Sequence, residues 1–403
     1  MGGSTRRGRP AQKVSRVLIL VCVLLTVPGA TAHAQSISDA LSFLLTNRSI
    51  ATGDFAGDEQ AANVTRDTIS SFLLAELGSL PISSSASGFS YEMDPGLGGV
   101  PTRATASFGP FFTERALTSG AGHFSLASTF QYARFDRIDG RQLASGTLVA
   151  TASRLTSDVQ PFDVETLTLR LSTATTTFSA TAGVTDRLDV SLAVPVTVLN
   201  MEGQRIDTLR GVSVQQAAAS ASTSGLGDMA WRAKFNLWHE SNTAFAVIAE
   251  GRLPTGRTED LLGSGRYTFR PRLVVSYDGD RVTMNGDAGY VIGSFSDEFD
   301  YGMGMTALPH PRVTIVGEVV GRRLSDAARL TEVAAPHPRL AGVETIRLTA
   351  SPQATNRVVA VAGVKYNLAA AWLLSANVSH FLSDAGLTAS WIPAVSLEYS
   401  FGG

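Results

Sequence analysis

The chain lacks three features that would place it in familiar classes. Its 403 residues include one cysteine, Cys22, which excludes a framework of disulfide bonds. No stretch contains the 18 or more consecutive apolar residues that a membrane-spanning helix needs. Neither sign of charge is in large excess, because the chain has 33 basic and 35 acidic residues. This balance argues against nucleic acid as a partner. The hydrophobic content of 44% is nevertheless enough for a sizeable core, so the chain is not a disordered one.

The first 34 residues have the order of a secretory signal peptide. Five basic residues between Arg6 and Arg16 precede an apolar run from Val17 to Val27, and a small-residue site ends at Ala34. A run of 11 residues is too short to remain as an anchor helix, so the sequence predicts cleavage after Ala34. Cleavage would remove Cys22 and the five basic residues, leaving 28 basic and 35 acidic residues and a net charge of −7.

From about residue 121 onward the hydrophobic pattern has a period of two. Between residues 228 and 237, apolar side chains at odd positions alternate with Asp228, Arg232 and Lys234 at even ones. In the run 164–184 the apolar residues change phase between Leu171 and Phe178, which predicts a bulge or bend. Most runs are longer than strands of soluble sheets. Twelve runs are found, at 122–135, 164–184, 187–199, 225–239, 243–254, 266–278, 281–293, 300–309, 312–323, 356–366, 371–382 and 391–401.

The connections between these runs come in two sizes that alternate along the chain. Tight connections lie at 185–186, 240–242, 279–280, 310–311 and 367–370. Longer ones lie at 136–163, 200–224, 255–265, 294–299, 324–355 and 383–390. Long alternating strands with short turns at one end and long loops at the other are typical of barrels in the bacterial outer membrane. A soluble β-sandwich also alternates, but its strands are shorter and its connections are not sorted by length. The sequence therefore predicts an all-β, antiparallel transmembrane barrel of 12 strands over residues 121–403.

Residues 35–120, which precede the barrel, follow a different pattern. Apolar residues have helical spacing over 37–45 and 69–77, which predicts two short helices. Residues 88–91 and 105–112 could add two strands and raise the number to 14. The segment is compatible with a plug inside the lumen, a periplasmic appendage or a part of the wall.

The energetics of lipid contact predict which residues line the lumen. A basic side chain turned towards lipid costs about 2–4 kcal/mol at the midplane, so the charged phase of each strand must face inwards. The aromatic residues on the opposite phase predict belts at the membrane interfaces: Trp231, Tyr267, Tyr277, Tyr290, Trp372, Trp391 and Tyr399. The main lumen-lining candidates are Arg170, Asp228, Arg232, Lys234, Glu250, Arg252, Arg270, Arg272, Asp287 and Glu318. Asp189, Arg312, Arg322, Lys365 and Glu398 share their phase and bring the set to nine basic and six acidic residues.

Two interpretations of these lumen charges stay open. A cationic inner wall would favour anionic solutes. Alternatively, cross-strand ion pairs would form a ladder that rigidifies a narrow lumen, with Glu250, Arg232 and Arg270 on neighbouring strands as suitable partners.

The last strand and several loop motifs resemble known outer-membrane proteins. Val395, Leu397, Tyr399 and Phe401 are similar to the C-terminal signal that the barrel-assembly machinery reads, although Gly402 and Gly403 follow it. Four further motifs resemble the outer-membrane family named for the meta-pathway of phenol degradation: Gly183–Asp189, Gly225–Asp228, Leu253–Gly256 with Leu262–Gly265, and Asn285–Tyr290. The resemblance covers about residues 180–400 and implies a channel or transporter for small molecules, aromatic ones among them. The same glycines, together with Pro254, also suit turns at the rim.

No pattern indicates an enzyme, a metal site or a cofactor. The sequence has no zinc-protease motif, no phosphate-binding loop and no Cys/His cluster, and Ser379 and His380 point to opposite faces of one strand. The leading hypothesis is an outer-membrane channel for small molecules, with lipid, the assembly machinery and a solute as partners. The second is a closed structural barrel whose loops 136–163, 200–224 and 324–355 bind partners without transport.

Overall fold

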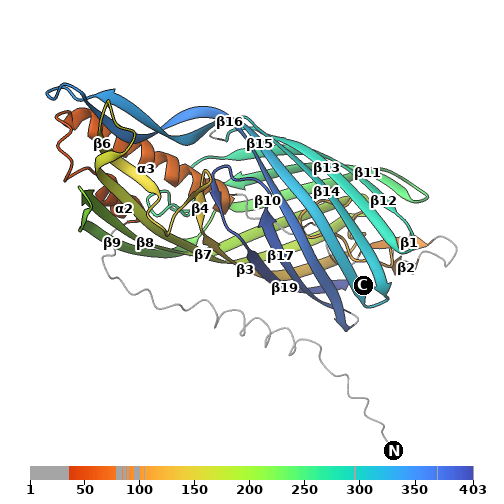
Figure 1. The fold of residues 1–403 in the computed structure, drawn as a ribbon. Coiled ribbons are helices and arrows are strands. Elements are labelled where there is room, and N and C mark those ends of the chain that lie inside the picture. The colour runs from red at the N-terminus through yellow and green to blue at the C-terminus, as the bar shows by residue number, and fades with distance from the viewer. Residues whose placement is uncertain are drawn as a thin grey trace, which may run out of the picture. The chain divides into compact units, whose positions relative to one another are not determined.

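A computed structural model describes residues 36–78, 84, 88, 90–94, 100–103, 105–294, 296–369 and 371–402. It confirms the predicted barrel, in which antiparallel strands form a ring that closes where β19 pairs with β3, from Ala394 opposite Gln131 to Gly402 opposite His123 (Figure 1). The 12 strands of the ring are β3 (His123–Phe135), β7 (Pro161–Thr185), β8 (Leu188–Leu209), β10 (Met229–Glu240), β11 (Thr243–Leu253), β12 (Thr268–Asp278), β13 (Val282–Val291), β14 (Glu298–His310), β15 (Val313–Pro336), β16 (Val343–Ala369), β17 (Trp372–Phe381) and β19 (Ile392–Gly402).

The outer surface of the ring is apolar, as lipid requires. Leu273 and Met303 are 67% and 73% exposed on this surface, where a water-soluble protein would carry polar side chains. Exposed aromatic residues lie near both rims, with Tyr277, Trp372 and Tyr399 at the end of the tight turns. Tyr267, Tyr290 and Trp391 lie at the other end, so the aromatic residues form two belts around an apolar band. The chain is a transmembrane β-barrel.

Four strands continue well beyond the membrane band, which corrects the predicted loops. β7, β8, β15 and β16 are 25, 22, 24 and 27 residues long. With β6 (Leu148–Leu155) and β9 (Val212–Leu226) they form a curved extracellular sheet in the order β9-β8-β7-β6-β16-β15. The segments 200–224 and 324–355, predicted as loops, are the arms of two long hairpins. Residues 136–163 contain β6 as well as β4 (Arg137–Ile138) and β5 (Arg141–Gln142), which form a small sheet with β18 (Leu387–Thr388).

Of the bulge or bend predicted within residues 164–184, the bulge is wrong, because β7 and β8 pair without interruption from Asp163 to Gly183. Odd-numbered residues of β7 face inwards along nearly the whole strand. In the membrane these inward residues are polar, such as Thr175 and Thr181, and Phe178 faces lipid. Above the membrane the inward residues are apolar, such as Leu169, because that part of the sheet surrounds a conventional core. Where β7 leaves the membrane, the apolar residues pass from its outer face to its inner face. The pairing of the backbone continues unchanged.

That core is built around two helices, as the spacing predicts. α2 (Ile37–Leu45) begins at Ser36, whose hydroxyl oxygen accepts a hydrogen bond of 3.0 Å from the Asp39 amide. α3 (Phe55–Gly78) begins earlier than predicted and is 24 residues long. Both pack against the concave side of the extracellular sheet, with Leu41 and Leu73 fully buried (Figure 1). Among the described residues, no helix is both long and apolar enough to span a membrane.

The strands predicted at 88–91 and 105–112 do not join the wall. β1 (Tyr91–Asp94) and β2 (Val100–Arg103) form a separate two-stranded hairpin. Residues 105–119 have no regular secondary structure. Burial explains this difference, because an extended segment inside the barrel can satisfy its backbone with side chains of the wall and needs no strand partner.

The contact between α2 and β8 requires a glycine. A Cβ atom at Gly203 would lie 2.3 Å from Leu44 Cδ1 and 2.9 Å from Leu169 Cδ2. Gly203→Val should therefore displace α2, at a cost of about 1–3 kcal/mol, and should speed proteolysis of residues 36–54 in the folded barrel. Gly317→Val is the matched control, because a Cβ there would meet no atom within 4 Å. Equal proteolysis rates in the two variants would contradict the packing described here.

Candidate functional site

Residues 105–119 cross the inside of the barrel in its periplasmic half, and carboxylates of the wall hold their backbone. Glu318 of β15 accepts hydrogen bonds from three consecutive amides: that of Phe111, that of Phe112 at 2.9 Å and that of Thr113 at 2.7 Å. Each of these amides would otherwise be a buried donor without a partner. One wall carboxylate therefore fixes the middle of the segment.

The same arrangement continues around the wall from β13 to β8. Asp287, Ser276 and Asp189 accept hydrogen bonds from the amides of residues 114, 116 and 119 at 2.8, 2.8 and 2.9 Å. The two lysines of the barrel donate hydrogen bonds to carbonyl oxygens of the crossing segment. Lys234 Nζ bonds to the carbonyl oxygen of residue 117 at 2.6 Å, and Lys365 Nζ to that of residue 110 at 3.1 Å. The lower half of the lumen thus binds a peptide backbone.

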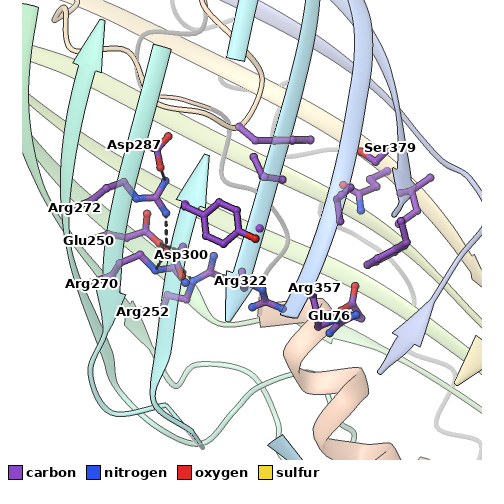
Figure 2. Close-up of a pocket in the computed structure, with 18 of the residues that line it drawn as sticks. Glu76, Glu250, Arg252, Arg270, Arg272, Asp287, Asp300, Arg322, Arg357 and Ser379 are labelled. Carbon is purple, nitrogen blue, oxygen red and sulfur yellow. Dashed lines mark hydrogen bonds and ion pairs between the residues drawn. The ribbon is translucent and has the colours of Figure 1, made fainter. Parts of the chain in front are cut away.

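Above this segment, charged side chains form a belt of ion pairs across the strands β10 to β16 (Figure 2). Arg232 contacts both Glu250, at 2.8 Å, and Glu114 of the crossing segment. Arg270 reaches Glu250 at 3.4 Å and Asp300 at 3.0 Å. The remaining pairs of the belt are Arg252–Glu250, Arg272–Asp287, Arg272–Asp300, Arg270–Glu298, Arg322–Glu298 and Arg357–Glu76.

Two cavities lie next to this belt and share three arginines. The inner cavity, of about 150 Å³, is bounded by Phe112 of the crossing segment. Glu76, near the end of α3, also lines it (Figure 2). The outer cavity, of about 490 Å³, lies between α3 and the extracellular ends of β11 to β16. Arg252, Arg270 and Arg322 line both cavities. The two cavities therefore meet at these three arginines.

The structure places most of the candidate lumen residues inside the barrel. Arg232, Lys234, Glu250, Arg252, Arg270, Arg272, Asp287 and Glu318 face inwards, together with Asp189, Arg322, Lys365 and Glu398. Arg232, Glu250 and Arg270 pair across neighbouring strands. Arg170 is a correction: it is exposed on the outside of the extracellular sheet, 3.5 Å from Glu202, because polar residues face outwards above the membrane. Arg312 is exposed at the turn between β14 and β15.

Sequence reasoning missed five members of the belt: Glu76, Glu114, Glu298, Asp300 and Arg357. Three of them could have been found. Asp300 is the first residue of the run 300–309, and Glu298 continues its alternation by one step towards the N-terminus. Arg357 is odd-numbered like Lys365 and therefore faces the same side of β16. Glu76 and Glu114 carry no periodic signal, because their segments are placed by tertiary contacts.

Asp228 is hydrogen-bonded to the loop motifs that follow it and fixes them at the mouth of the barrel. Its carboxylate accepts hydrogen bonds from the Ser264 amide and hydroxyl, both at 2.7 Å, and from the Gly256 amide at 3.1 Å. A Cβ atom at Gly256 would lie 2.6 Å from the Cα of Gly263, so the loop needs glycine at this crossing. These motif residues shape the rim.

At the other end of the chain, the residues of the C-terminal strand face lipid. Val395, Leu397, Tyr399 and Phe401 are exposed on the outer surface of β19. The rings of Tyr399 and Trp372 lie 4.7 Å apart, and Phe401 stacks on Phe124 of β3 at 5.7 Å. The strand is thus part of the wall and of the aromatic belt.

A group of charged residues on β7 and β8 holds the linker between α2 and α3. Glu165 contacts the Ser49 hydroxyl, and Arg205 donates to the Leu44 carbonyl oxygen at 3.1 Å at the end of α2. Burial, together with the hydrogen bond to Asp207 and the repulsion from it, raises the pKa of the Asp163 carboxyl to about 7. Burial also raises the pKa of Glu165.

The closed ring, the apolar exterior and the charged lumen together define an outer-membrane β-barrel. A family model described as "Putative MetA-pathway of phenol degradation" matches residues 134–308, which confirms the resemblance seen in the sequence motifs. The match begins before the residues that carry that resemblance and ends before the C-terminal strands. No curated protein matches the chain in sequence.

Among solved structures, the chain is similar to an outer membrane channel from Pseudomonas putida F1, with 13% identity and a TM-score of 0.46 over 71% of this chain and 98% of that one. It is also similar to the KdgM porin, with 9% identity and a TM-score of 0.35 over 69% and 99% of the two chains. A FadL homologue from Pseudomonas aeruginosa has 9% identity and a TM-score of 0.35 over 80% and 99%.

The raised pKa of Asp163 predicts a pH dependence of the pairing between β7 and β8 beside Asp207. The folded protein binds a proton at this carboxyl more tightly than the unfolded chain does, so the contribution to stability is complete below pH 3.8 and is lost as the pH rises to about 7. Hydrogen exchange at residues 207–209, which pair with β7 beside Asp163, should therefore quicken over this range beyond its intrinsic pH dependence. Asp163→Asn should flatten that excess, leaving a smaller slope from Glu165. An unchanged slope would contradict the assignment.

Proposed function

We propose that the chain is a passive outer-membrane channel for small organic anions, including aromatic ones, rather than an enzyme. The observation that carries the proposal is the pair of cavities that share Arg252, Arg270 and Arg322 inside a closed transmembrane barrel. A solute entering from outside would pass α3, cross the shared arginines and reach the inner cavity. The proposed location is the outer membrane, after removal of residues 1–34 and assembly through the C-terminal strand.

The lining of the inner cavity supports the choice of solute. Its basic residues are six arginines: Arg232, Arg252, Arg270, Arg272, Arg322 and Arg357. Its acidic residues are Glu76, Glu250, Asp287 and Asp300, so the basic residues exceed the acidic ones by two. A surplus of positive charge at a narrow place lowers the energy of an anion there. Two aromatic side chains, Phe112 and Phe381, offer faces on which a planar ring could pack.

In this proposal residues 105–119 are a plug, and residues 36–78 form a helical collar at the extracellular mouth. The plug borders the inner cavity at Phe112, and α3 borders it at Glu76. Because its backbone is held by hydrogen bonds to side chains of the wall, it can leave when water replaces those partners, without breaking any strand pairing. Passage to the periplasm would require this displacement.

Fastening the plug to the wall should abolish conduction. The Ala116 amide lies 2.8 Å from Ser276 Oγ, so Ala116→Cys with Ser276→Cys places two thiols close together in a chain whose own cysteine, Cys22, lies in the predicted signal peptide. Joining them by oxidation or by a short thiol-reactive linker should lower the open probability in planar bilayers by at least about tenfold. Reduction should restore it.

The single variant Ala116→Cys serves as the control and should conduct like the unmodified protein under both conditions. Conduction that survives complete cross-linking would show that the pathway avoids the plug. No conductance in the unmodified protein or in the reduced double variant would favour the closed structural barrel instead.

The arginines shared by both cavities should set the ion selectivity. Arg252→Gln removes one of them while Glu250 keeps its ion pairs with Arg232 and Arg270. The reversal potential in a salt gradient should shift towards cations, because the local positive potential falls. Arg170→Gln is the matched control, since Arg170 is exposed outside the barrel. An equal shift in both variants would mean that overall charge, and not the lumen, determines selectivity.

A further inference from the structure

The extracellular sheet ends in a strand whose outer edge is unpaired. β9 bonds to β8 along its whole length, from Leu226 opposite Val196 to Val212 opposite Leu209. Among the residues that the structure describes, no other strand pairs with β9. Below it the wall continues as β10 and β11, but above the membrane band the curved sheet is open between β9 and β15.

Two hydrogen bonds show which backbone groups of β9 point to the open side. The Gly227 amide donates to the Pro195 carbonyl oxygen at 2.9 Å, so odd-numbered residues here face β8. The Ser224 carbonyl oxygen instead accepts a bond of 3.1 Å from Arg257, a residue of the rim loop. Because the N–H and C=O of one strand residue point to the same side and alternate along the strand, Ala218, Ser220 and Ser222 present theirs to the open edge.

The composition of β9 leaves this edge without the usual protection. Residues 212–226 contain no charged residue and no proline, and 217–226 pair regularly below a bulge near Gln216. The other open edge of the same sheet, β15 above Leu324, carries Asp326, Arg329 and Glu332 and ends at Pro336. Charges and proline are the standard means of preventing strand addition. The edge formed by β15 is therefore protected against the addition of a strand, and the edge formed by β9 is not.

We propose that β9 is a docking edge for an extended segment of another polypeptide at the cell surface, which adds a strand to the sheet next to Ala218, Ser220 and Ser222. A row of alternating donors and acceptors is complementary to an extended peptide backbone. The small side chains of this edge, alanine, serine and threonine, leave room for a neighbouring strand to approach.

Membrane geometry excludes a second copy of the chain as the occupant. Copies in one membrane share their orientation, so a two-fold axis relating them must lie along the membrane normal. A strand inclined by roughly 35–45° to that normal meets its symmetry mate at a crossing angle. Neither parallel nor antiparallel pairing of β9 with itself is then possible over several residues.

Binding of a defined peptide to the full barrel tests the proposal. The probe is a short blocked peptide of alternating threonine and valine with a fluorophore, added to the protein in liposomes with the extracellular side outwards. It should bind and should slow hydrogen exchange at residues 218, 220 and 222. Ser220→Pro removes an edge amide but no bond to β8, so it should preserve the heat-modifiable gel shift and weaken binding by about tenfold or more.

Ser220→Ala is the matched control and should bind like the unmodified protein, because the edge amide is kept. The same peptide with alternate amides N-methylated should not bind. Absence of binding to the unmodified protein, or equal binding to Ser220→Pro, would overturn the proposal. Protection of residues 218–222 by a rise in barrel concentration alone, lost in Ser220→Pro, would assign the edge to a second copy and would overturn it equally.

Discussion

Hydrocarbon offers no hydrogen-bonding partner, and the remaining structure depends on this constraint. Every backbone group in the membrane band must be paired within the wall, which only a closed sheet achieves, and every charged side chain must turn inwards. The lumen consequently contains many polar groups that need partners of their own. The crossing segment and the ion-pair belt supply them: Glu318 accepts three backbone amides, and Arg270 joins carboxylates of β11 and β14.

The same constraint ends at the membrane surface, and the residue types along the long strands show the height at which it ends. Along β8 the inward residues change from Asp189 and Thr197 to Leu199 and Met201, while the outward ones change from Val198 to Glu202. β7 changes at the matching height, since Thr173 pairs with Leu199. One continuous hairpin therefore has its polar residues inside and its apolar residues outside in the membrane. Above the membrane the same hairpin has apolar residues inside, where they belong to a hydrophobic core. The helices α2 and α3 occupy that upper core.

The periodicity of the sequence was sufficient to predict the ring of strands, because lipid on one face and water on the other impose alternation residue by residue. It was insufficient above the membrane, where the meaning of the alternation reverses. Arg170 was assigned to the lumen, and residues 200–224 were assigned to a loop, for that reason. Glu114 and the rest of the crossing segment have no periodic pattern, because their positions are determined by partners more than 100 residues away, such as Asp287 and Arg232.

The path of the N-terminal residues has a consequence for the order of assembly. α3 lies at the extracellular mouth, whereas residues 105–119 lie in the periplasmic half and lead directly into β3. Of the residues between them that the structure describes, Ser84 and Ser90 are buried, and the Ser84 amide donates a hydrogen bond of 3.0 Å to the Phe111 carbonyl oxygen inside the wall. A helix is about 10 Å wide with its side chains, and the lumen is already occupied by the ion-pair belt, so α3 cannot be threaded through a finished barrel. Pairing of β19 with β3 after this segment is in place is the order of assembly that requires no threading of a folded helix, because it seals the ring around the segment.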